Sequence, residues 1–219
     1  MSLWIKICAN TSLADAQLAV EAGADAVGFV FAPSPRRVTA EQVAAITAYL
    51  PAAVEKIGVF VDAPLDEIES TVRLCGLTGV QLHCDAQPGL AAELRARFGA
   101  GLRIVRVVHF GSDAAQQAAA IAQDTHVDAV LVDSRTATAV GGTGVAFDWT
   151  EARSTVFAGA KGLKLVAAGG LNPANVAEAI ATLRPWGVDV ASGVEAAPGR
   201  KDAVKVQAFV ANARAAARA

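Results

Sequence analysis

The 219-residue sequence has few of the residues that mark metal-binding and disulfide-linked proteins. It contains 3 cysteines and 3 histidines, and none of them follows a zinc-ligand or His-x-x-x-His spacing. An odd number of widely spaced cysteines does not indicate a disulfide framework in a chain of this length. We therefore expect no metal site, and we expect reduced thiols in a cytoplasmic protein.

An excess of charge of one sign and long apolar runs are also missing. The 19 basic and 21 acidic residues give a net charge of −2, whereas a nucleic-acid or membrane surface favours a strongly basic patch. No segment offers about 20 uninterrupted apolar residues, and the N-terminal MSLWIKICAN lacks the pattern of a signal peptide. These absences argue against nucleic acid and membrane as partners and leave a small uncharged or anionic ligand.

The sequence does contain a regular series of short apolar runs. Their starts lie about 20 to 35 residues apart, and most runs are continuous rather than alternating, as in parallel strands that are covered on both faces. The runs are Trp4–Cys8, Ala26–Phe31, Ile57–Asp62, Val80–His83, Arg103–Phe110, Ala129–Asp133, Leu165–Gly170 and Val188–Gly193.

The segments between the runs predict helices with recognisable ends. Thr39 and Gln42 have the spacing of a capping box, and the helix that they begin is expected to end at Leu50, before Pro51. A later helix is expected to start with Asn172 as its cap and proline at its first position. The first helix is expected to end at Gly23.

Eight strands that alternate with helices define an α/β chain. The length favours a closed, single-domain (βα)8 TIM barrel over residues 1–219, and an open doubly wound sheet is the alternative. In such a barrel, the loops that follow the carboxyl ends of the strands carry the chemistry.

Glycine-rich loops after the sixth, seventh and eighth strands predict a phosphate site, because residues without Cβ let backbone N–H groups converge on an anion. The alternative is that these glycines only make tight turns between strand and helix. The loops after the seventh and eighth strands carry AAGGLNPAN and VASGVEAAPG, and a phosphate commonly lies at these two loops in a barrel of this class.

Several reactive side chains stand at expected strand ends. Cys8 is either a small core residue or a base, and a base would need a cationic neighbour such as Lys6 to become a thiolate. Asp133 is either a turn cap or an acid whose pKa is raised by desolvation. His83 and His109 are either pocket histidines or general acids or bases.

The loop APSPRRV carries two arginines that the prolines help to present. A planar guanidinium matches a carboxylate or a phosphate, and a solvated surface arginine is the alternative for at least one of the pair. The two arginines are Arg36 and Arg37.

The strand ends and the loops that follow them carry a series of motifs. They are KIC at 6–8, GFVFAPSPRRV at 28–38, VQLH at 80–83, LVDS at 131–134, GGTGVAFDW at 141–149, AAGGLNPANVAEAI at 167–180 and GVDVASGVEAAPGRKD at 187–202. Together these motifs resemble one family, the phosphoribosylanthranilate isomerases of tryptophan biosynthesis. The resemblance runs nearly from end to end, and the motifs occur in the family's order.

The resemblance implies a reaction and a set of roles. The family converts N-(5′-phosphoribosyl)anthranilate to 1-(2-carboxyphenylamino)-1-deoxyribulose 5-phosphate by an Amadori rearrangement, without a cofactor. Asp133 would be the general acid that opens the ring, and Cys8 the general base that takes the C2′ proton. Arg36, His83 and Asp189 would contact the substrate, with Arg36 on its carboxylate. The phosphate would rest on backbone groups of Gly141, Gly142, Thr143, Gly169, Gly170, Ser192 and Gly193. A monomer is expected, since one subunit supplies the whole mouth of the barrel.

The chain departs from the family at Ala9 and Cys84, where glycine is usual, and at Asn10, where an apolar residue is more common. If position 9 requires a positive φ, alanine is strained there. Two alternative functions are the related histidine-pathway isomerase, which uses aspartates at the first and sixth strands, and a sugar-phosphate binder without turnover. Cys8 argues against the first alternative.

Overall fold

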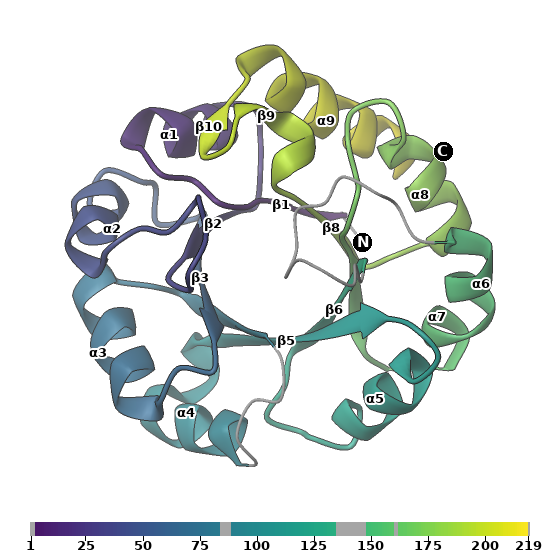
Figure 1. Ribbon diagram of the computed structural model, residues 1–219, viewed down its shortest axis with the longest axis horizontal. Helices are drawn as coiled ribbons and strands as arrows, with labels where there is room; N and C mark the ends of the chain where they lie inside the picture. Colours follow the sequence, from purple (N-terminus) through teal and green to yellow (C-terminus); the bar gives the residue numbers. More distant parts are fainter. Residues whose placement is uncertain (1–2, 84–88, 135–147, 160–161, 219) are drawn as a thin grey trace.

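The eight apolar runs form a closed parallel barrel in the computed structural model, which describes residues 3–83, 89–134, 148–159 and 162–218. Each strand pairs with the next one along the chain, and β1 also pairs with β8 (Figure 1). The predicted closed barrel is confirmed, and the open sheet is wrong. The strands are β1 (Trp4–Ile7), β2 (Ala26–Val30), β3 (Glu55–Val61), β4 (Gly79–His83), β5 (Arg103–Phe110), β6 (Ala129–Ser134), β7 (Lys164–Ala167) and β8 (Gly187–Val190).

Helices surround the barrel as an outer ring (Figure 1). No helix within the described ranges is long and apolar enough to cross a membrane. A short antiparallel pair, β9 (Glu195–Ala197) and β10 (Arg200–Lys201), follows β8. The helices are α1 (Leu13–Glu21), α2 (Ala40–Thr47), α3 (Leu65–Cys75), α4 (Leu90–Phe98), α5 (Ala114–Ile121), α6 (Trp149–Ser154), α7 (Val156–Gly159), α8 (Val176–Leu183) and α9 (Ala203–Ala216).

The predicted helix ends hold in part. The capping box of Thr39 and Gln42 is present, but α2 ends at Thr47 rather than at Leu50, because Leu50 closes a tighter turn onto the Thr47 carbonyl. The predicted cap of α8 is wrong. Asn172 accepts a hydrogen bond from the N–H of Ala174 in a turn of its own, and the helix begins only at Val176.

Strand alternation divides the buried side chains into two layers. One set faces the helices and forms the large outer core, which includes Ile5, Ile7 and Phe29. The other fills the barrel and includes Ile57 and Leu131. The polar side chains inside the barrel, such as Gln81, Asp133 and Asp189, lie toward the carboxyl ends of the strands, beyond the apolar ones. The carboxyl ends of the strands, called the upper end below, therefore carry the chemistry.

Stacked tryptophans close the barrel at the amino-terminal ends of its strands, which form its lower end. The rings of Trp4 and Trp186 lie 5.2 Å apart at an interplanar angle of 22°. Stacked rings contribute about 0.5–1.5 kcal/mol beyond the apolar area that they bury. This pair of rings leaves the upper end, where the strands finish, as the functional face.

Candidate active site

Lys6 and Cys8 point to the same side of β1, into the barrel. A Cβ atom added to Gly28 would lie 2.7 Å from Cys8 Sγ and 2.9 Å from Lys6 Cε, so both side chains pack over this glycine. The Cys8 N–H donates to the carbonyl of Val190 at 2.8 Å, which extends the pairing of β1 with β8 beyond Ile7. Cys8 is therefore a buried thiol at the mouth, beside a buried ammonium.

The turn after Cys8 is strained, as the sequence indicates. Ala9 has a φ of 61°, in the left-handed region that favours glycine. Asn10 holds this turn, because its side-chain amide donates to the carbonyls of Ile7 at 2.8 Å and Gly28 at 3.2 Å. The departure at Asn10 thus supplies hydrogen bonds that fix the chain carrying Cys8.

Lys6 is fully buried and lies between two polar partners. Its Nζ donates to Asp189 Oδ1 at 3.0 Å and to Gln81 Oε1 at 2.9 Å. Burial alone lowers the pKa of Lys6, but Asp189 and Cys8 outweigh it, so the net pKa shift is upward and the side chain is an ammonium. Burial raises the pKa of the Cys8 thiol, and the Lys6 charge opposes that rise without cancelling it, so the net pKa shift is upward.

Asp133 at the end of β6 has the properties of a general acid. Burial, followed by the charge of Asp189, raises its pKa from 3.8 to about 6. The N–H of Ser134 donates to its Oδ1 at 2.8 Å and opposes this rise, as Lys6 does. A carboxyl group that titrates near neutral pH can hold a proton and deliver it.

Asp133 borders a small cavity of about 50 Å³ at the ends of β6, β7 and β8. Gly169 has a φ of 73°, and a Cβ there would lie 2.7 Å from Asp133 Oδ1. A Cβ at Gly193 would overlap the Leu171 carbonyl. The lining of this cavity includes Asp133, Gly169, Gly170, Asp189, Ser192 and Gly193, which are all site residues predicted from the sequence.

Arg36 is held at the mouth by Glu195 on β9. Its Nε and Nη2 donate to the two carboxylate oxygens at 2.9 and 2.8 Å in a bidentate pair. Buried Lys201 lies 3.4 Å from the same carboxylate. Although burial raises the pKa of Glu195, hydrogen bonding by Arg36 and the charge of Lys201 give a net lowering, so the carboxylate is ionised.

His83 is buried at the end of β4, beside His109. The ring centroids lie 5.5 Å apart, and burial followed by the charges of His109 and Lys6 lowers the pKa of His83 to about 4. Within the described ranges, His83 Nδ1 has no hydrogen-bond partner. A neutral imidazole at this position can donate or accept a hydrogen bond but does not carry charge near neutral pH.

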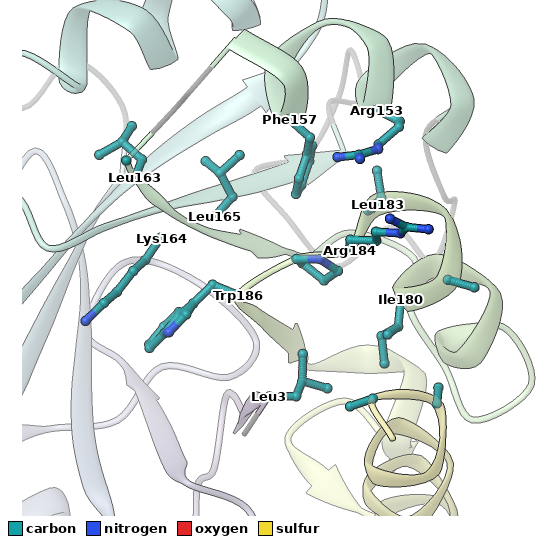
Figure 2. A pocket seen from close by; sticks show the side chains of 15 residues that line it. Leu3, Arg153, Phe157, Leu163, Lys164, Leu165, Ile180, Leu183, Arg184 and Trp186 are labelled. Carbon is teal, nitrogen blue, oxygen red and sulfur yellow. The ribbon is translucent and has the colours of Figure 1, made fainter. Parts of the chain in front are cut away.

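A larger cavity of about 1080 Å³ lies at the opposite end of the strands, beside Lys164 and Trp186 (Figure 2). Its lining is mostly apolar with basic side chains at Arg153, Lys164 and Arg184, and contains no acidic residue, histidine or cysteine among the residues described. Because it lacks a group able to transfer a proton near neutral pH, we place the chemistry at the upper end.

The structure therefore gathers most of the predicted residues at one mouth. Gly141, Gly142, Thr143 and Cys84 lie outside the described residues. The sequence reasoning missed Gln81, Glu195 and Lys201, although all three stand in the quoted motifs. Because a barrel interior is apolar by default, a polar residue inside a predicted strand was the signal that could have found Gln81. Glu195 and Lys201 follow the eighth strand and carry no such signal.

The arrangement suits two proton transfers on a small anionic substrate. An acid on β6 and a thiol after β1 border the same mouth, with glycine turns next to the acid. No group of three or more metal-ligating side chains occurs in the part of the chain that the structure describes.

Comparison with known proteins gives a consistent result. The family model described as N-(5′-phosphoribosyl)anthranilate (PRA) isomerase matches residues 5–212. The N-(5′-phosphoribosyl)anthranilate isomerase of Geobacter sp. (strain M21) is 44% identical over 96% of this chain and 97% of its own. The crystal structure of the Thermotoga maritima phosphoribosyl anthranilate isomerase is 36% identical, with a TM-score of 0.85 over 97% of this chain and 99% of that one.

A second crystal structure is of a phosphoribosyl anthranilate isomerase in complex with reduced 1-(o-carboxyphenylamino)-1-deoxyribulose 5-phosphate. It is 34% identical, with a TM-score of 0.83, and the match covers 97% of this chain and 99% of that chain.

Proposed function

Since this chain belongs to the N-(5′-phosphoribosyl)anthranilate isomerase family, we propose that Asp133 and Cys8 are the acid and base of its reaction. The enzyme catalyses the Amadori rearrangement of N-(5′-phosphoribosyl)anthranilate in tryptophan biosynthesis. The observation that carries the proposal is the position of a buried carboxyl group and a buried thiol at one barrel mouth, joined through the Lys6–Asp189 ion pair.

In the first step, the protonated Asp133 carboxyl group gives its proton to the furanose ring oxygen as the bond between C1′ and that oxygen breaks. The nitrogen lone pair forms the C1′=N bond of a protonated Schiff base. The pKa of about 6 leaves a usable fraction of the carboxyl groups protonated near neutral pH.

In the second step, the Cys8 thiolate removes the proton from C2′. The electron pair of the C2′–H bond forms the C1′=C2′ bond, and the electrons of the C1′=N bond return to nitrogen, which gives an enolamine. The enol then loses its O–H proton as C1′ gains one, and the ketone results. One proton must pass from Cys8 to Asp133, through solvent, before the next turnover.

The remaining residues bind the substrate. Arg36, held in place by Glu195, faces the anthranilate carboxylate, and Asp189 and neutral His83 line the mouth. The phosphate rests on backbone N–H groups of the three glycine-rich loops, and the lack of Cβ atoms at Gly169 and Gly193 supports this position. Those loops comprise Gly141, Gly142, Thr143, Gly169, Gly170, Ser192 and Gly193.

We also propose that residues 1–219 act as a single catalytic domain, as a monomer in the cytoplasm, on a small phosphorylated substrate and without nucleic acid, membrane or cofactor. A site built within one chain supports the monomer. Static light scattering should return the mass of one chain, and twice that mass would overturn the monomer.

The acid is tested with Asp133→Asn, which keeps the shape and removes the proton. Because one positioned group contributes about 10²- to 10⁴-fold, kcat should fall within that range. Anthranilate fluorescence follows turnover, and titration with the reduced product analogue follows binding, which should change only a few-fold. Asp62→Asn, an exposed aspartate just beyond β3, is the matched control. Native kcat in Asp133→Asn would remove the role.

A further inference from the structure

We propose that the Lys6–Asp189 ion pair is a positioning pair, whose ammonium favours the thiolate form of Cys8 while its carboxylate favours the protonated form of Asp133. The inference rests on the proposed roles of Cys8 and Asp133. It goes beyond them because neither Lys6 nor Asp189 exchanges a proton with the substrate.

The ammonium half of the pair lies beside the base. Lys6 has three N–H donors, and Asp189 and Gln81 accept two of them. Lys6 Cε and Cys8 Sγ meet over Gly28, which brings the ammonium end of the lysine toward the sulfur. Among the charged groups that affect Cys8, Lys6 lowers its pKa the most, against the rise caused by burial.

The carboxylate half lies beside the acid. Asp189 and Asp133 both line the small cavity at the ends of β6 to β8. After burial, the charge of Asp189 is the largest contribution to the raised pKa of Asp133, and the opposing charge of Lys6 contributes less than Asp189 does. The pair therefore has its positive end toward the thiol and its negative end toward the acid.

Other charged groups also face Cys8. Lys201 on β10 lowers the pKa of Cys8, and Asp189 raises it. Arg36 approaches from the loop after β2 and is influenced by Cys8 in turn. Both Lys201 and Arg36 contact the Glu195 carboxylate, which offsets their charge. Lys6 is thus the cation whose removal should affect Cys8 most.

Loss of the ion pair should change the shape of the pH profile of kcat/KM. The active form carries a thiolate and a protonated carboxyl group at once, although the carboxyl group is the stronger acid of the two. Such a form is a constant minority between the two pKa values, and its fraction falls tenfold for each unit by which they move apart. Loss of the pair should therefore lower the plateau of kcat/KM and widen the profile together.

Lys6→Met removes the ammonium and keeps most of the volume. An opposite charge at this range shifts a pKa by roughly 1–3 units, so the basic limb should move up by that amount and the plateau should fall about 10- to 1000-fold. Because Asp189 then stays buried without its partner, the double variant Lys6→Met/Asp189→Asn provides a neutral, foldable pair. In the double variant the acid limb should also move down.

Lys56→Met is the matched control, because Lys56 is also a buried strand lysine, and its Nζ donates to the carbonyl of Pro51 rather than to a carboxylate. Titration of the thiolate by ultraviolet absorbance, as the difference from Cys8→Ser, reports the base without turnover. An unmoved Cys8 titration and unmoved limbs in both Lys6 variants would overturn the inference. Native turnover in Cys8→Ser would instead overturn the proposed base, so the two failures are distinguishable.

Discussion

Replacing Asp133 by asparagine should stabilise the fold while it removes activity. The folded protein raises the pKa of this buried carboxyl group from 3.8 to about 6. A raised pKa means that the folded state binds the proton more tightly than the unfolded state, so stability is lost as pH rises from about 4 to 6. Above pH 6, the rise in pKa from 3.8 to about 6 corresponds to a loss of up to about 3 kcal/mol in the free energy of unfolding.

Asparagine carries no charge and keeps an oxygen that can accept the Ser134 N–H hydrogen bond. At pH 8, Asp133→Asn should therefore be more stable by up to about 3 kcal/mol, a rise in Tm of about 6–12 °C for a chain of this size. At pH 5 the gain should shrink to about half, because the native carboxyl group is then largely protonated.

Thermal unfolding followed by circular dichroism at both pH values measures the effect. Asp62→Asn should change the stability by less than about 0.5 kcal/mol at either pH, since the side chain is exposed. A gain in Asp133→Asn that is equal at pH 5 and pH 8, or a loss at pH 8, would refute the electrostatic reasoning.

Two further predictions concern the backbone of the mouth. Gly193→Ala places a Cβ against the Leu171 carbonyl, so it should lower the free energy of unfolding by about 1–3 kcal/mol and raise KM for the phosphorylated substrate more than tenfold. Gly101 has open space around it, so Gly101→Ala, the control, should change neither quantity by much. Denaturant unfolding and steady-state kinetics check both, and unchanged KM would remove Gly193 from the phosphate site. Ala9 has a φ of 61°, so Ala9→Val should destabilise the fold by about 2 kcal/mol or more, whereas Ala9→Gly should change its stability by less than about 1 kcal/mol. Equal effects of the two variants would show that backbone strain does not govern this turn.

The order of the fold could be read from the sequence because each strand is a continuous apolar run. Burial on both faces of a parallel strand requires that pattern, and all eight runs became barrel strands. The resemblance to the isomerase family is confirmed by the comparisons as well. Helix ends were harder, because Asn172 can cap a helix or close a turn by the same side-chain hydrogen bond.

The buried polar network could not be predicted from local pattern. Lys6, Gln81 and Asp189 lie on three different strands, and only closure of the barrel brings β1 and β4 across from each other. Likewise, the Arg36–Glu195 pair joins positions 159 residues apart. Such contacts depend on topology, whereas Cys8 and Asp133 could be found from their positions at strand ends.

The proposed mechanism depends above all on removal of the C2′ proton by Cys8, and the turnover of Cys8→Ser measures that step. Serine keeps the shape but is a far weaker acid, so little alkoxide is available as a base. We expect kcat, followed by loss of anthranilate fluorescence, to fall by at least about 100-fold while affinity for the reduced product analogue changes only a few-fold. A kcat close to that of the native enzyme would show that Cys8 is not the base.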